Sequence, residues 1–491
     1  MKRQTLTVVA VILLLGVRCP PGFPQVPEAG KATPLKGVER KNRAPVNKEI
    51  LRVRLPRPTE VKLANGLTVL VLERHKLPTV TLALWIKTGA LADPKDLPGL
   101  ASFTAHMLRE GTTHRSSAQL AAEVDDIGAS LGASADFGSN ISTVTASGLV
   151  ENVNKIVELM SDVVLNPTFP AEELEKYKKR ELADLEVKRS LPAFLGQEKF
   201  FQVLYRDFPA SVVSATPDSV KGVTVEQLKR FHAQDYVPNN AILGVAGDVT
   251  KDQILPTIEK YFGAWKGRSV DEPKLGPVPP TAPSKVYVVD RPNSVQTNIV
   301  VGDLAVRRAD PDYIPLTVMN RILGGGPSAR LFLNLREEKG YTYGVYSYFG
   351  ADIYPGAWIA STEVRTAVTD GSMRELMAEF RCIREQKVPE AELDEARRSL
   401  VARFALSLEQ PAALLNSWLT VKYYNLPEDY WDRYPEEAAK VSQDMVQRMA
   451  KKYVDLGHLQ IVCVGDGKQV RDVLNKYGPV EVYDVEGKRL E

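Results

Sequence analysis

Two segments far apart in the chain repeat one pattern. Residues 241–248 read AILGVAGD, a buried strand followed by a turn, and the helix after them ends at Lys260-Tyr261-Phe262-Gly263. Residues 459–466 read LQIVCVGD and lead into a helix that ends at Lys476-Tyr477-Gly478. Because the segments match in order, pattern and length, they indicate an internal duplication. The duplication predicts two homologous α/β (α+β) lobes, one in each half of the chain.

A proline-rich stretch separates the two halves. Residues 271–284 hold five prolines, a composition typical of a linker. It predicts a first lobe over residues 56–270 and a second lobe over residues 285–480. A chain of 491 residues is too long for one ordinary domain, and 44% apolar and 25% charged residues are typical of globular protein. A net charge of +2 without a long basic run argues against nucleic-acid binding.

The N-terminus has the pattern of an export signal. Lys2 and Arg3 precede an apolar run over residues 6–17, which is too short to span a bilayer comfortably. We predict a signal peptide over residues 1–19 and a flexible leader over residues 20–55, hence a periplasmic or envelope-associated protein. Lipidation at Cys19 is disfavoured because Arg18 precedes it. No later run is long enough for a membrane helix.

Periodicity and turn residues predict several elements of both lobes. Residues 61–72 are predicted as a hairpin, because two β-rich runs flank Asn65-Gly66. In the first half we also predict a strand over residues 79–88, a strand pair over 129–146, and helices over 117–127, 150–164, 170–188 and 227–235. In the second half we predict strands over 285–290 and 298–304 and a helix over 313–323.

The stretch GLASFTAHMLREGT, residues 99–112, reads as a helix that ends near Gly111. It closely resembles the zinc helix of the insulinase/pitrilysin family, whose signature is H-x-x-E-H. In that signature two His four residues apart hold one zinc ion, and the Glu is the general base. Here Ser102 stands at the first His position and Ala105 at the Glu position, so only His106 remains.

The resemblance covers roughly residues 56–477 and implies a fold. Members of the family are clamshells of two homologous lobes, each a mainly antiparallel sheet covered by helices, facing each other across a chamber. The family's third zinc ligand lies on a helix downstream, where Asp184 falls at or near the matching position. We favour the reading of Asp184 as part of a solvated helix face. The resemblance thus implies a chain without zinc and without peptidase activity of its own.

A second block, GGGPSARLFLNLREEKGYTYGV over residues 324–345, is similar to the most recognisable part of the family's second lobe. It reads as a glycine-rich loop, a helix over residues 328–339 and a strand. The resemblance implies that an Arg and a Tyr here, Arg330 and Tyr343, reach the zinc site to bind peptide and stabilise the oxyanion. Alternatively, Arg330 pairs with a carboxylate such as Glu337, and Tyr343 packs in the core.

These resemblances favour the inert chain of a heterodimer similar to the mitochondrial processing peptidase. A homologous partner with an intact H-x-x-E-H would carry the zinc, and the substrate would be a peptide or unfolded segment added to a sheet edge at residues 132–136. One alternative is a peptide-binding or scaffold protein without a peptidase role. Another is a self-sufficient metallopeptidase with an atypical site. Cys382 and Cys463 are expected to be two buried thiols rather than a disulfide.

Overall fold

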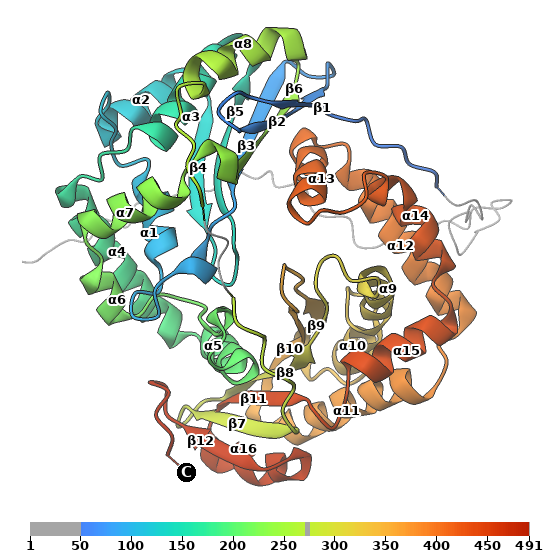
Figure 1. Cartoon of the computed structure of the whole chain (residues 1–491). Helices are drawn as coiled ribbons and strands as arrows, with labels where there is room; N and C mark the ends of the chain where they lie inside the picture. The colour runs from blue at the N-terminus through green and yellow to red at the C-terminus, as the bar shows by residue number, and fades with distance from the viewer. Residues whose placement is uncertain (1–50, 271–274, 491) are drawn as a thin grey trace, which may run out of the picture. The chain divides into compact units, whose positions relative to one another are not determined.

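The structure is a computed structural model that describes residues 51–270 and 275–490 (Figure 1). The signal peptide predicted over residues 1–19, Cys19, and all but the last five residues of the predicted leader lie outside the described residues. The first four residues of the predicted linker lie outside them too. Residues 275–284 of that linker form no helix or strand.

The first lobe contains a six-stranded sheet in the order β1-β2-β6-β3-β5-β4. Its strands are β1 (Thr59–Lys62), β2 (Thr68–Glu73), β3 (Thr79–Ile86), β4 (Ser130–Ala135), β5 (Ser142–Leu149) and β6 (Ala241–Gly247). Only β2 and β6 pair in parallel, and the other pairs are antiparallel. The predicted hairpin is confirmed, since β1 and β2 flank a turn in which Gly66 adopts a φ of +95°.

The second lobe contains another six-stranded sheet in the order β12-β7-β11-β8-β10-β9. Its strands are β7 (Lys285–Asp290), β8 (Gln296–Leu304), β9 (Thr342–Phe349), β10 (Ala357–Arg365), β11 (Gln460–Gly465) and β12 (Val480–Tyr483). The run β7-β11-β8-β10-β9 repeats the order and directions of β2-β6-β3-β5-β4. The predicted duplication is therefore confirmed. The sixth strand differs, because β1 joins its sheet antiparallel and β12 joins in parallel.

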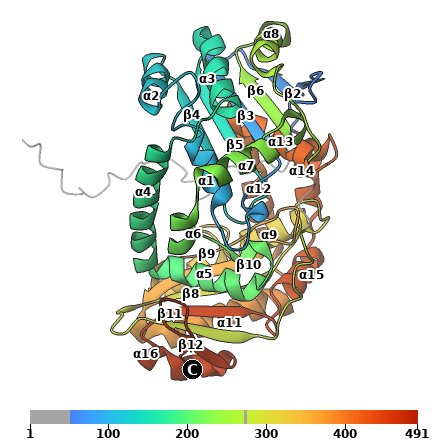
Figure 2. The same cartoon turned by 60° about the vertical axis from the view of Figure 1, so that its left-hand side comes forward.

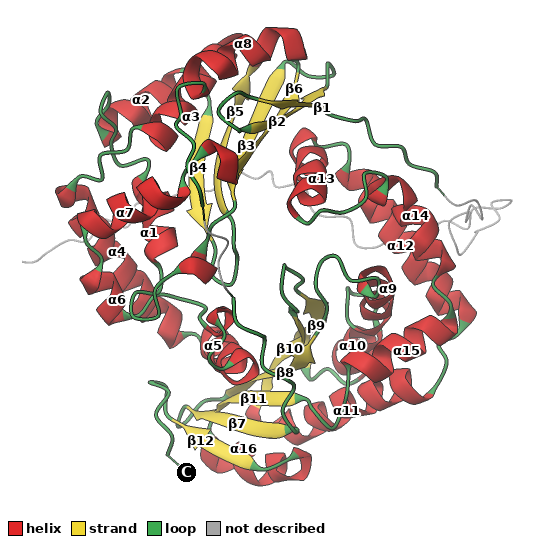
Figure 3. Cartoon of the chain, viewed as in Figure 1, coloured by secondary structure: helices red, strands yellow, loops and turns green. Residues whose placement is uncertain are grey.

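Helices cover both sheets (Figure 3). Those of the first half are α1 (Leu100–Met107), α2 (Ser117–Asp126), α3 (Val153–Leu165), α4 (Ala171–Ser190), α5 (Pro192–Tyr205), α6 (Pro217–Gly222), α7 (Val225–Asp235) and α8 (Lys251–Phe262). Those of the second half are α9 (Tyr313–Leu323), α10 (Arg330–Phe332), α11 (Thr369–Glu385), α12 (Glu390–Ser407), α13 (Pro411–Tyr423), α14 (Tyr430–Lys440), α15 (Gln443–Tyr453) and α16 (Gly467–Leu474). None of the helices within the described ranges is long and apolar enough to cross a membrane.

Each sheet buries one face under helices of its own half and the other under a helix of the opposite half. Helix α13 packs on the first sheet, where Leu415 and Trp418 join a cluster with Leu70 of β2 and Ile242 of β6. Helix α5 packs on β8 and β11 of the second sheet in the same way. Figures 1 and 2 both show α5 beside the second sheet. This exchange joins the two halves through their apolar cores.

Both cysteines of the folded lobes are free thiols. Cys463 lies fully buried in β11, and its burial raises the pKa of the thiol to about 12. Cys382 is half-buried on α11. The expectation of unpaired thiols is confirmed, although Cys382 is less buried than predicted.

Candidate functional site

Helix α1 begins at Leu100, as predicted from the sequence, but ends at Met107 rather than near Gly111, and a buried carboxylate fixes its start. Gly99 precedes it with a φ of +100°, and Asp93 accepts hydrogen bonds from the backbone N–H groups of Gly99 at 2.7 Å and Ala101 at 2.8 Å. A carboxylate there satisfies donors that the first helical turn leaves unpaired. Burial nevertheless raises the pKa of Asp93 to about 7.

The three positions of the degenerate motif lie as the helical period predicts. Ser102 and His106, four residues apart, are half-exposed on one face of α1, while Ala105 is fully buried. That face meets helix α4, where the His106 ring stacks on Tyr177 with the ring centres 3.7 Å apart. The Tyr177 hydroxyl also interacts with the side chain of Ser102. Burial raises the pKa of Tyr177 to about 12.

The Arg180 guanidinium group contacts Nε2 of His106, a ring nitrogen through which a histidine can bind a metal. Arg180 Nη2 is 3.0 Å from His106 Nε2, and Glu110 Oε1 lies 3.2 Å from the same nitrogen. The hydrogen bond with His106 lowers the pKa of Glu110, and a hydrogen bond from Ser117 acts in the same direction. The Arg180 guanidinium further lies 5.2 Å from the centre of the Tyr177 ring. The His106 ring is therefore in contact with three other side chains, those of Tyr177, Arg180 and Glu110.

These residues do not fit a zinc site of the family's kind. Zinc at a catalytic centre needs about three protein ligands plus water, whereas this site offers one imidazole, one serine and the Glu110 carboxylate, with the Arg180 guanidinium against the imidazole. Asp184 is exposed on α4 and makes no hydrogen bond or ion pair with His106 in the described chain. Among residues 51–270 and 275–490, no three His, Cys, Asp or Glu side chains are grouped to hold a metal ion. We derive no catalytic step through a metal on this chain.

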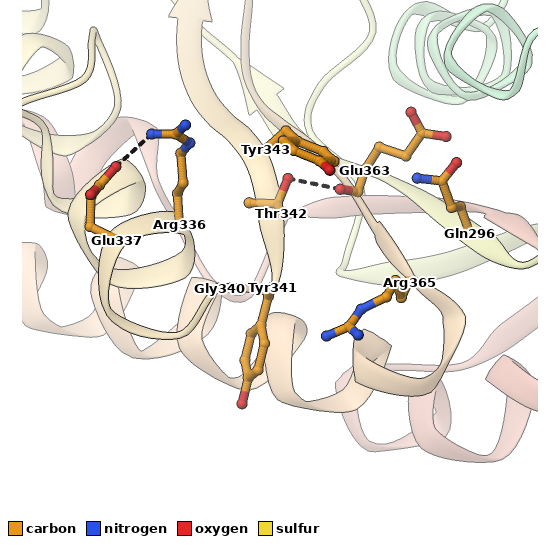
Figure 4. Close-up of a pocket in the computed structure, with 9 residues that line it drawn as sticks. All are labelled: Gln296, Arg336, Glu337, Gly340, Tyr341, Thr342, Tyr343, Glu363 and Arg365. Atoms are coloured by element: carbon orange, nitrogen blue, oxygen red, sulfur yellow. Dashed lines mark hydrogen bonds and ion pairs between the residues drawn. The ribbon is translucent and has the colours of Figure 1, made fainter. Parts of the chain in front are cut away.

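A polar cavity of about 580 Å³ lies in the second lobe, beside the start of β9 (Figure 4). It is lined by Gln296, Arg336, Glu337, Gly340, Tyr341, Thr342, Tyr343, Glu363 and Arg365. Two irregular elements border it. A π-helical turn, η5 (Leu333–Glu338), follows α10, where the sequence had predicted one continuous helix. Such turns and bulges often re-aim side chains at functional sites.

The second irregularity is a β-bulge that turns Tyr343 outward. The register of β9 on β10 shifts between Val364, opposite Thr342, and Thr362, opposite Val345. The Thr342 Oγ1 atom accepts a hydrogen bond from the Gly344 N–H at 3.1 Å and lies 2.8 Å from the Glu363 carbonyl oxygen (Figure 4). The Tyr343 side chain is 93% exposed. The sequence had left open that Tyr343 packs in the core, and this exposure rules that alternative out.

The structure does not bring Arg330 and Tyr343 together. Arg330 forms a bidentate pair with Glu392, with Nε 2.8 Å and Nη2 2.6 Å from the carboxylate oxygens, and its Nη1 lies 3.5 Å from Cys382 Sγ. The predicted alternative, an ion pair of Arg330, is present, but its partner is Glu392 and not Glu337. That pairing raises the pKa of Arg330.

Arg336 and Arg365 are the two arginines that share the cavity with Tyr343, and sequence reasoning missed Arg336, the nearer of them in the chain. It lies on the π-helical turn and pairs with Glu337 at 2.6 Å, with both side chains about half exposed. No sequence pattern would have paired Arg336 with Tyr343. A π-helical turn and a β-bulge lie between the two residues, so neither a helical nor a strand period connects them.

Both sheets present an open edge next to these features. Strand β4, predicted as the edge over residues 132–136, is the last strand of its sheet and pairs only with β5. Helix α1 packs against β4 and β5, so the degenerate motif and the edge are neighbours. Strand β9 is the matching edge of the second sheet. Edge strands carry unpaired backbone groups that an extended peptide can join.

Comparison with known proteins identifies the family. A profile described as "Insulinase (Peptidase family M16)" matches residues 68–210, and one described as "Peptidase M16 inactive domain" matches residues 222–400. The chain belongs to the M16 peptidase family. The M16 relatives include a protein named an uncharacterized zinc protease from Mycobacterium leprae, 26% identical over 73% of this chain and 80% of the relative. Another protein named an uncharacterized zinc protease, from Rickettsia felis, is 28% identical over 72% of this chain and 84% of the relative.

Solved structures share the fold. A peptidase M16 inactive domain from Pseudomonas fluorescens superposes with a TM-score of 0.78 at 26% identity, covering 83% of this chain and 98% of that one. A protease from Helicobacter pylori also gives a TM-score of 0.78, at 18% identity, over 84% of this chain and all of that one. The two-lobed α/β architecture predicted from the sequence is therefore confirmed.

Proposed function

We propose that this M16 protein is the non-catalytic subunit of an exported heterodimeric zinc metallopeptidase. Its second lobe supplies Tyr343, together with an arginine, to a peptide held at a zinc site on a homologous partner chain. One observation carries the proposal: Tyr343 is 93% exposed beside Arg336 in a formed cavity, while the face of α1 that carries His106 is occupied by Arg180. In this proposal one half of a peptidase site is kept and the other half is lost.

The chemistry of Tyr343 suits a role in trans. Peptide hydrolysis builds negative charge on the carbonyl oxygen of the bond that breaks, and a preorganised donor stabilises that charge. In this proposal the Tyr343 hydroxyl, which is 93% exposed on this chain, becomes such a donor when the partner chain and the peptide fix its position. An arginine fork holds peptide carbonyl oxygens or carboxylates with two parallel hydrogen bonds. In this proposal Arg336 takes the role that the resemblance gave to Arg330, because the Arg336–Glu337 pair is about half exposed beside Tyr343, whereas Arg330 is held by Glu392 with only 15% of its side chain exposed.

The substrate class follows from the open sheet edges. An extended peptide or unfolded segment would add to β4 through backbone hydrogen bonds. The small side chains of β4, such as Gly132 and Ala133, leave room for another backbone. The N-terminal signal pattern supports an exported, periplasmic or envelope location for the pair.

A second candidate function is peptide binding without any peptidase role. The observation in its favour is the ion pair of Arg330 with Glu392, which leaves only one of the two predicted substrate residues accessible. The open edges of β4 and β9 serve a binding protein as well as a peptidase subunit.

Co-purification of the tagged full chain from its native envelope fraction, with mass spectrometry of the bound proteins and elemental analysis, separates the two functions. The proposal predicts a partner of similar size that carries an intact H-x-x-E-H and one zinc ion per pair. Recovery of the chain with only unrelated, zinc-free proteins would contradict it and favour the binding role.

A further inference from the structure

We propose that a second cavity, at the far end of β9 from Tyr343, is a subsite for a large apolar side chain of the bound peptide. The cavity has a volume of about 510 Å³, within the range of about 300–1,000 Å³ that is usual for ligand sites. Six aromatic residues line it: Phe137, Phe201, Tyr205, Tyr348, Phe349 and Tyr354. The inference rests on the proposed function for the direction in which the peptide lies.

The lining of the cavity selects the chemistry of its ligand. It contains no lysine, arginine or histidine. Its one acidic residue, Asp352, already accepts a hydrogen bond from the Ile353 N–H at 2.6 Å and interacts with the Tyr424 hydroxyl. Burial raises the pKa of Asp352. Acidic side chains therefore find no partner here, whereas an aliphatic or aromatic side chain gains apolar contact on several sides.

Both lobes build the cavity and hold it in shape. The Tyr354 hydroxyl, from the loop between β9 and β10, donates a hydrogen bond of 2.6 Å to the carbonyl oxygen of Gly138. Gly138 lies in the turn that follows β4 and has a φ of +74°. Tyr205 of α5 donates to the Pro355 carbonyl oxygen at 3.1 Å. The cavity thus adjoins the end of the edge strand β4, where the proposed function places the peptide.

Strand β9 connects this cavity to the polar cavity beside Tyr343. Tyr343 lines the polar cavity at one end of β9, and Tyr348 lines the aromatic cavity at the other. Tyr346 lies between the two cavities and is exposed on the same side of the strand as Tyr348. Five strand residues span about 17 Å at roughly 3.3 Å per residue. A peptide that passes from the end of β4 into the aromatic cavity and runs on in extended form beside β9 therefore places its apolar side chain about five residues from the residue beside Tyr343.

A binding experiment on the full chain tests the apolar subsite without any partner. The probe is a fluorescently labelled 12-residue peptide of Gly, Ser and Thr with one central Phe, and its twin has Ser in place of Phe. By fluorescence anisotropy, the Phe peptide should bind about tenfold or more tightly than the Ser peptide. Equal affinity of the two peptides would overturn the inference.

Two variants of one helix localise the binding. Gln197 of α5 is exposed and lines the cavity, so Gln197→Trp should fill its mouth and abolish the advantage of Phe over Ser. Gln202 is exposed on the same helix and does not line the cavity, so Gln202→Trp is the matched control and should leave the advantage unchanged. An unchanged advantage in Gln197→Trp would place the Phe elsewhere and contradict the inference.

Photo-cross-linking tests the spacing and separates this inference from the proposed function. The probe is the same peptide with benzoylphenylalanine at the Phe position and a second one five residues away. Cross-links of the first to the aromatic cavity and of the second near Tyr343 support the spacing, and cross-links at unrelated surfaces overturn it. If Phe-dependent binding and these cross-links are seen but no zinc-bearing partner exists, the subsite stands and the peptidase role fails. If a partner is active but binding ignores Phe, only the subsite fails.

Discussion

Arg180 Nη2 lies 3.0 Å from His106 Nε2, on the nitrogen that remains from the family's zinc ligands. A positive charge at this distance opposes a divalent cation directly, since two like charges a few Å apart repel by several kcal/mol when partly shielded from water. The difference between this face and a zinc site of the family thus involves more than Ser102 and Ala105. It includes a residue on α4 that the zinc motif does not contain.

Restoring the motif alone should not restore the metal. The double variant Ser102→His, Ala105→Glu recreates H-x-x-E-H on α1, but we expect no stoichiometric zinc by elemental analysis while Arg180 is present. Adding Arg180→Glu removes the cation and supplies a carboxylate next to His106, and we expect about one zinc ion per chain.

Arg189→Glu is the control for that series. It makes the same charge change on α4, but its side chain pairs with Glu198 rather than with His106. The double variant with Arg189→Glu should stay without zinc. Tight one-to-one zinc in the double variant with Arg180 intact would show that Arg180 does not block the site.

The packing of α13 on the first sheet can be tested with two substitutions that compensate for each other, one at Gly244 and one at Leu415. A Cβ atom at Gly244 of β6 would lie 2.6 Å from Leu415 Cδ1 of α13. Gly244→Ala should lower the free energy of unfolding by about 1–3 kcal/mol through overpacking. Leu415→Ala, at a fully buried position, should lower it by about 2–5 kcal/mol.

The double variant Gly244→Ala, Leu415→Ala should lose less than the sum of the two losses, because the added methyl group occupies space that the leucine leaves. Denaturant unfolding of the four proteins measures the coupling. Strict additivity would mean that α13 does not pack on Gly244.

Lys199 of α5 should give the stability a distinct pH dependence. It is buried with its Nζ 3.1 Å from the centre of the Tyr483 ring, and burial lowers its pKa from 10.5 to about 8. Between these values the unfolded chain binds more protons than the folded one, so the free energy of unfolding should rise with pH across this window. Below pH 8 both states are protonated and the Lys199 contribution stays constant.

Lys199→Met removes this titration. Thermal unfolding at pH 7.5, 8.5 and 9.5 should show a smaller rise in stability for the variant than for the wild type. Lys178→Met, which removes a lysine paired with Glu175 on α4, is the control and should keep the wild-type rise. Parallel curves for wild type and Lys199→Met would contradict the assigned burial.

The β-bulge that exposes Tyr343 should depend on the Thr342 hydroxyl. Thr342→Val keeps the shape of the side chain but leaves the Gly344 N–H without its hydrogen bond, which costs about 1–2 kcal/mol. Thr81→Val is the control, because the Thr81 hydroxyl makes no side-chain hydrogen bond in the described part of the chain. Equal unfolding free energies for the two variants would show that the hydroxyl does not hold the bulge.

Local patterns in the sequence predicted the frame of the fold well. The hairpin at Asn65-Gly66, helix α1 and the duplicated strand–helix units all lie where period and turn residues placed them. These features depend on contacts between near neighbours in the chain. The exchange of α5 and α13 between lobes was not predicted, because it depends on contacts between residues more than 90 positions apart, such as Phe200 with Val300.

The candidate site was less accessible to sequence reasoning. His106, Ser102 and Ala105 were placed on one helix from the resemblance of residues 99–112 to the family's zinc helix, and the helical period then put Ser102 and His106 on one face. The direction of the Arg330 side chain could not, because Glu392 lies 62 positions away and was not predicted as its partner. The π-helical turn and the bulge also break the regular periods of this block, so no pattern pointed to Arg336.

The most direct test is turnover by the reconstituted pair with Tyr343→Phe, which removes only the hydroxyl. The account predicts about a hundredfold lower kcat with zinc content and pairing unchanged, because one oxyanion donor is lost. Tyr346→Phe, three residues along the same strand and outside the polar cavity, should keep wild-type turnover. Unchanged turnover in Tyr343→Phe would contradict the claim that this chain completes the active site of its partner.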